Sequence, residues 1–190
     1  GNLTLTEPDI DLIEISEETK FLSGMNGKDL SKAQMHILDL AKALDSDLSI
    51  EFADGLESDG MYIRSQNKIL IKSDISVVRM YGIVFKHEMM HHFETKKLYD
   101  KFFNYCFNNS VVFEKYIHTE LKKENPNIEI ENETRESVFN FYTEYKYNQY
   151  KNCDAISEID RERFTYENAQ QVIVADFFAN VLFKGKENGD

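Results

Sequence analysis

Cysteines, basic residues and long apolar runs are all scarce in this chain of 190 residues. The two cysteines, Cys106 and Cys153, form neither a CxxC pair nor a cluster with histidine, so the sequence shows no disulfide framework or zinc knuckle. We expect two reduced thiols in a cytoplasmic protein. The net charge of −12 works against nucleic acid as a partner, because Lys and Arg must neutralise its phosphates.

No apolar run approaches the roughly 20 residues needed to cross a bilayer, and no signal segment opens the chain. We therefore expect a soluble protein that has no membrane partner. Gly1 without a preceding methionine indicates a processed or engineered start, which leaves a removed targeting segment open. The content of 42% apolar residues predicts one domain over residues 1–190, while no pattern indicates its oligomeric state.

The first half of the chain predicts a helix followed by a small sheet. The acidic residues 1–27 are expected to form an arm or edge segment. Apolar residues at the i, i+3, i+4 spacing predict an amphipathic helix over 28–45. Alternating apolar residues predict a strand near 48–52 and, after two turn signals, a hairpin over 61–72.

The second half predicts helices throughout. Ser73 and Asp74 stand at the expected N-cap of an apolar helix that runs to residue 97, and residues 98–185 form the helical half before a tail at 186–190. Aromatic residues at helical spacing, such as Phe139 and Tyr142, are expected in its core. The predicted fold class is α+β, mainly helical, with a small N-terminal antiparallel or mixed β-sheet packed on the helix before the helical half.

The stretch "FKHEMMHHFE", residues 85–94, carries the chemistry of this chain. On a helix, His87 and His91 point the same way, so both imidazoles can bind one zinc ion. Glu88 lies beside them and can act as general base, taking a proton from a water whose pKa zinc lowers toward roughly 7. His92 points about 100° away from His91 and is expected either at the surface or as a residue that supports the ligands, rather than as a ligand.

The setting of this motif distinguishes a metal site from a chance match. Met80 and Val84 lie on the same stripe as the two histidines, so the histidines are predicted to continue a buried face of a helix that follows a sheet. The motif and its setting, over about residues 28–97, resemble the zincin metallopeptidases. The extended "HExxHxxGxxH" pattern is absent, since Glu94 and Lys97 replace its Gly and third His.

The resemblance to zincins implies a third ligand from a later helix, commonly a Glu four residues before an Asp. The helix "QQVIVADFFANVLF" resembles that of small zincins from Gram-positive bacteria, phage and mobile elements, and more loosely the ImmA/IrrE type. In this chain Val172 stands at the ligand position, four residues before Asp176.

Asp176 is itself surrounded by apolar residues, and a carboxylate there is costly unless it is paired or bound to a metal. We expect it to be the third ligand, or else the partner that orients His87. Glu136 and Glu167 are the alternatives.

Three functions follow from these residues. The first is a zinc-dependent peptidase that holds a protein or peptide substrate against an edge strand, at residues 61–65 or 69–72. The second is a degenerate zincin that serves as a non-catalytic metal-binding or protein-interaction module, because Val172 replaces a ligand. The third is a helical interaction protein in which the motif is accidental.

Overall fold

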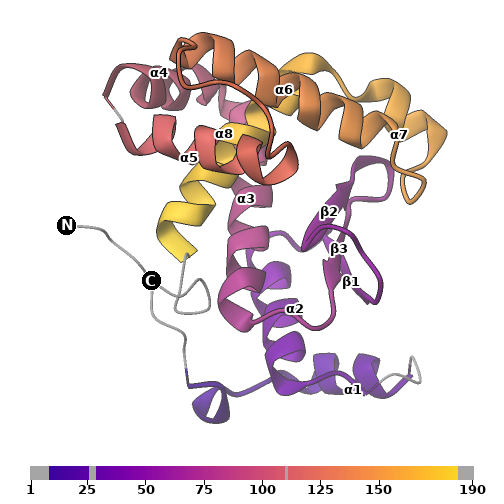
Figure 1. Ribbon diagram of the computed structural model, residues 1–190. Helices are drawn as coiled ribbons and strands as arrows, with labels where there is room; N and C mark the ends of the chain where they lie inside the picture. Colours follow the sequence, from indigo (N-terminus) through magenta and orange to yellow (C-terminus); the bar gives the residue numbers. More distant parts are fainter. Residues whose placement is uncertain (1–8, 26–28, 110, 184–190) are drawn as a thin grey trace. The chain divides into compact units, whose positions relative to one another are not determined.

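The computed structural model describes residues 9–25, 29–109 and 111–183 (Figure 1). The chain forms two compact units, which we call the sheet unit (Gly1–Glu88 with Ala179–Asp190) and the helical unit (Met89–Phe178). The fold class is α+β: helices dominate, and the sheet is small and mixed. The expected tail at 186–190 lies outside the described residues, and a single zincin-like domain stays a prediction.

Helix α2, Lys32–Leu44, confirms the amphipathic helix expected over 28–45. It begins at Ser31, whose side chain accepts from the Gln34 N–H while the Gln34 side chain accepts from the Ser31 N–H, a capping box that satisfies two terminal donors. Ile37 and Ala41 are its buried residues. The helix ends at Asp45, whose N–H donates to the Ala41 carbonyl.

Strands β1 (Ser49–Ala53), β2 (Gly60–Ile63) and β3 (Lys68–Lys72) form a mixed sheet in the order β1-β3-β2. β2 and β3 are antiparallel, which confirms the hairpin, and β1 runs parallel to β3. Asn67 ends the connecting turn with φ 44°, a left-handed conformation that Asn tolerates better than most residues. Because β3 pairs on both sides, residues 69–72 as an edge strand are wrong; the alternative at 61–65 stays a prediction.

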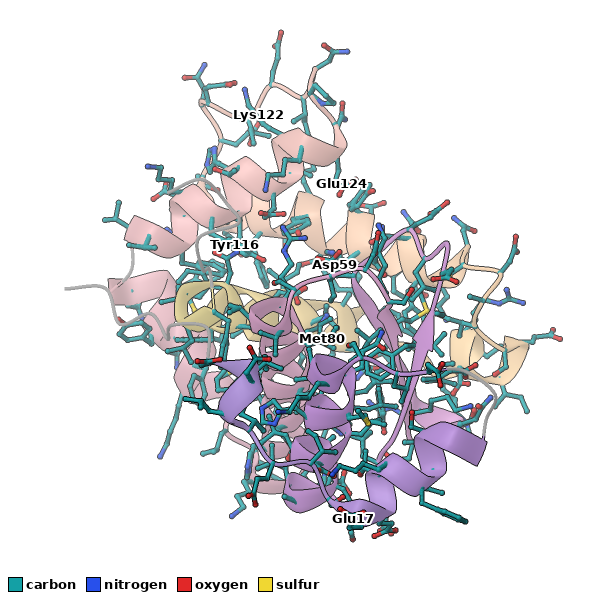
Figure 2. The ribbon with its side chains drawn as sticks, turned by 90° about the horizontal axis from the view of Figure 1, so that it is seen from below. Glu17, Asp59, Met80, Tyr116, Lys122 and Glu124 are labelled. Carbon is teal, nitrogen blue, oxygen red and sulfur yellow. The ribbon has the colours of Figure 1, made fainter. Side chains whose placement is uncertain are left out.

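Helix α3, Val77–Lys96, carries the histidine motif, as predicted. It begins later than expected because Ser76, rather than Ser73 or Asp74, accepts from the Arg79 N–H. The core of the sheet unit lies between this helix, α2 and the sheet, and Met80, labelled in Figure 2, lies within it. Its buried members are Ile37, Ala41, Leu48, Phe52, Ile69, Ile71, Val77, Val78, Met80 and Val84.

The segment expected to be an arm folds into a 3-10 helix, Ile10–Leu12, and helix α1, Glu17–Met25. Asp39 of α2 explains this difference, because its carboxylate accepts from the Ser16 N–H and hydroxyl and from the Thr19 hydroxyl. Burial alone would raise the pKa of Asp39, but these hydrogen bonds lower it overall. The anchor joins residues 20 or more positions apart, so local periodicity does not reveal it.

The helical unit contains α4 (Tyr99–Asn109), α5 (Val111–Glu124), α6 (Arg135–Lys151), α7 (Glu158–Arg163) and most of α8 (Tyr166–Phe183). No strand occurs among its described residues, which confirms the helical half (Figure 1). Rings from four helices pack against one another in its core, with edge-to-face contacts between Phe107 and Phe139 and between Phe113 and Phe177, and a tilted contact between Phe113 and Phe139.

We predict that Phe139→Ala destabilises the protein by about 3 to 5 kcal/mol, because it removes a buried ring and leaves a cavity. Phe139 is 2% exposed and contacts the rings of Phe103, Phe107 and Phe113. Urea unfolding followed by circular dichroism measures the change. Phe141→Ala, at a position 43% exposed on the same helix, is the control and should cost less than about 0.5 kcal/mol. Equal losses would mean that this aromatic cluster does not stabilise the fold.

Candidate metal centre

His87 is the buried histidine of the motif, with 8% of its surface exposed. It continues the stripe that begins with Met80 and Val84, so the predicted buried face extends to this residue. On the sheet side, the ring of Tyr62 from β2 lies 4.5 Å from the His87 ring, centroid to centroid. The Tyr62 hydroxyl donates to the Asn67 side chain, which fixes the tyrosine against the hairpin. Helix and hairpin together therefore hold the imidazole in place.

Two carboxylates approach the Nε2 atom of His87. Oδ2 of Asp45, at the C-terminal end of α2, lies 3.7 Å away, and Oε1 of Glu88 lies 4.0 Å away. The ligand atoms of these three residues all lie within 4.8 Å of one another. Both carboxylates are partly shielded, with side-chain exposures of 26% for Asp45 and 21% for Glu88. Glu88 therefore lies beside the His87 ring nitrogen, as the motif predicts.

The second motif histidine is placed differently from His87. His91 follows one turn later on α3, yet its side chain is exposed, and it is not a member of the three-residue group. His92 is also exposed, in agreement with a surface role. The prediction that His87 and His91 bind one ion together stays a prediction.

Asp176 falls in the helical unit and has a distinct set of neighbours. The pKa values of Tyr116 on α5 and Tyr142 on α6 are both raised, first by burial of their hydroxyls and next by the negative charge of Asp176. Asp176 is itself half-buried, as is Val172 one turn before it. The assignment of Asp176 as a metal ligand or as a partner of His87 stays a prediction.

The alternative acids of the second half lie at the surface. Glu136 is exposed near the start of α6, and Glu167 is exposed near the start of α8. The remaining acids considered there are exposed as well: Glu131, Glu133 and Glu144. Their exposure agrees with solvated side chains, which need no metal to offset a desolvation cost.

The donor set around His87 fits a zinc ion. An imidazole nitrogen and carboxylate oxygens are ligands that zinc accepts at about 2.0 to 2.2 Å, and a buried histidine is the usual anchor of such a site. Two ligand atoms on one tetrahedral ion lie about 3.3 Å apart when their bonds are about 2 Å long. The separations of 3.7 and 4.0 Å at His87 are close to that spacing.

Sequence reasoning missed Asp45. It follows the last residue of α2 in the stretch "LDSD", which has the composition of a turn and carries no metal-binding pattern. Its approach to His87 depends on the packing of α2 against α3, two helices separated in the sequence by the whole sheet. No local spacing reports such a contact.

Comparison with known proteins found no match: no protein-family model, curated protein or solved structure matches the chain. The resemblance to zincins therefore rests on the motif of α3 and on its setting after α2 and the sheet. None of the described helices is both long and apolar enough to span a membrane.

Proposed function

We propose that this protein is a zinc-dependent peptidase of the zincin type, in which His87 and His91 bind the ion and Glu88 is the general base. The observation that carries the proposal is the surroundings of His87, a buried imidazole on the motif helix with two carboxylates at its Nε2 atom. A third carboxylate ligand completes the set. The sequence pattern favours Asp176 for that role.

The roles of the residues follow from where they lie. Tyr62 and the core of the sheet unit hold the His87 ring, so the ligand is oriented before metal binds. When bound, zinc supplies a Lewis acid and lowers the pKa of water toward about 7. Glu88 is half-buried beside the same ring nitrogen, where its carboxylate can accept a proton from the attacking water and return it to the leaving amine. A protein or peptide is the substrate that this chemistry serves.

The second candidate is a degenerate zincin that binds metal or a protein partner without catalysis. Two observations favour it: Val172 stands where the resemblance implies a ligand, and the His91 side chain is exposed. A protein can keep a fold after losing its catalytic activity, so the motif alone does not decide between the two candidates. The two candidates differ in hydrolysis, which only the first carries out.

Elemental analysis of the purified protein tests the metal site on which the peptidase depends. We expect about one zinc per chain, since an anchored imidazole and carboxylate donors suit that ion. Dialysis against a chelator should remove the zinc, and added zinc should restore it. A chain that takes up no zinc from a micromolar excess would contradict the proposal and favour a helical interaction protein with an accidental motif.

A further inference from the structure

Asp45 is held by its own turn in a way that directs one carboxylate oxygen toward His87. Its N–H donates to the Ala41 carbonyl at 2.8 Å, and its carbonyl accepts from the Leu48 N–H at 3.1 Å. Oδ1 accepts from the Asp47 N–H at 3.1 Å. These bonds fix the backbone and one oxygen of the side chain. The other oxygen, Oδ2, is the atom that lies 3.7 Å from His87 Nε2.

The separation between Asp45 and His87 is compatible with a shared ion. An N–H···O hydrogen bond spans about 2.7 to 3.2 Å, and the 3.7 Å found here is longer. Two donors on one tetrahedral zinc lie about 3.3 Å apart. A ligand bond therefore requires only a small adjustment of a side chain that its turn has already oriented.

The negative charges of Asp45 and Glu88 near His87 also favour a bound cation. The ligand oxygens of Asp45 and Glu88 lie within 4.8 Å of each other and of the His87 nitrogen, and both side chains are partly shielded from water. Two carboxylates at this range repel each other, and the repulsion grows as water is excluded. A divalent cation bound at this site would offset that cost.

We infer that Asp45 is a protein ligand of the metal, an inference that rests on the proposed zinc site. Asp45 takes the role for which the sequence pattern favours Asp176, while Glu88 is left to act as base. Asp45 and His87 both belong to the sheet unit, and the packing of α2 against α3 in that unit brings them together. Asp176 belongs to the helical unit, where its charge acts on Tyr116 and Tyr142.

The test measures the zinc affinity of the full chain by competition with a chromogenic chelator. Asp45→Asn keeps an oxygen for the Asp47 N–H, so the turn survives, whereas Asp45→Ala removes both oxygens. We expect each variant to bind zinc more than about 100-fold more weakly than the wild type. Loss of a residue that only orients a ligand lowers metal affinity by about 10- to 100-fold, so a larger loss indicates a ligand. Asp47→Asn, at an exposed position in the same turn, is the matched control and should bind as the wild type does.

A second readout separates a ligand from a residue needed for folding. Cobalt replaces zinc in such sites, and its visible absorption reports the ligand set directly. The Asp45→Asn spectrum should change while far-UV circular dichroism stays that of the wild type. Asp176→Asn should leave both the affinity and the spectrum unchanged.

The outcomes distinguish the inference from the proposed function. Wild-type affinity in both Asp45 variants, with a large loss in Asp176→Asn, overturns the inference and leaves a zinc site that uses Asp176. A loss of only about 10- to 100-fold with an unchanged cobalt spectrum also overturns it, since Asp45 would then orient His87 rather than bind the metal. A wild-type chain that binds no zinc overturns both.

Discussion

Replacing His87 with alanine is expected to abolish zinc binding at micromolar metal. This residue supplies the one buried imidazole of the group, and both nearby carboxylates are arranged around its Nε2 atom. Without this imidazole the site loses its one buried, preoriented nitrogen donor, a ligand type that suits zinc. The affinity should fall by more than about 100-fold, the upper limit for loss of a residue outside the ligand set. Chelator competition and elemental analysis measure it.

His92→Ala is the matched control, because it removes an exposed imidazole from the same helix and should leave the zinc content unchanged. His91→Ala tests whether the exposed second histidine joins the site, and it should weaken binding, though less than His87→Ala does. Stoichiometric zinc in the His87→Ala, His91→Ala double variant would place the ion elsewhere and refute the site.

Helix α2 and the hairpin of the sheet unit could be predicted because each depends on local pattern. Helix α2 follows from apolar spacing and from the Ser31 cap, and the hairpin from alternation around a turn that Asn67 closes. The mixed sheet agrees with the predicted class. Which strand lies in the centre did not follow, because strand order depends on the pairing of β1 with β3, which no local pattern reveals.

The features that sequence reasoning missed are contacts between distant segments. Helix α1 is anchored by Asp39, and the approach of Asp45 to His87 joins the end of one helix to the middle of another. In both cases an acidic side chain approaches a residue that is distant in the sequence: Asp39 accepts hydrogen bonds from Ser16, and Asp45 lies near His87. Periodicity predicted the buried face that holds His87, but it extended that face to His91, which is exposed. The face therefore ends between the two histidines.

That difference between the two histidines bears on how the site would assemble. His87 is oriented by packing before any metal arrives, and so is Asp45, through its turn. His91 has no such restraint from burial and would be ordered by the ion, which costs side-chain entropy of up to about 1 to 2 kcal/mol. Zinc affinity should therefore depend more on His87 than on His91.

Glu88→Gln should leave zinc bound but stop hydrolysis. The amide keeps the shape of the side chain and its capacity for hydrogen bonding, while it cannot accept a proton as the carboxylate does. Loss of the general base should lower turnover by roughly 10² to 10⁴, with little change in zinc affinity or folding. The measurement is a peptide-library digest by wild type and variant, each with and without chelator. Cleavage that needs both the metal and Glu88 supports the peptidase.

Glu94→Gln provides the control, because it makes the same change at an exposed position of the same helix and should cleave as the wild type does. Equal cleavage by wild type and Glu88→Gln would point to a contaminating protease. A zinc-loaded wild type that cleaves nothing across a broad library would favour the degenerate zincin. In that case Val172→Glu, which restores the acid that the zincin resemblance implies, tests whether the change at this single position removed the activity. Cleavage regained by Val172→Glu would support this only if a chelator and the added Glu88→Gln change each abolish it.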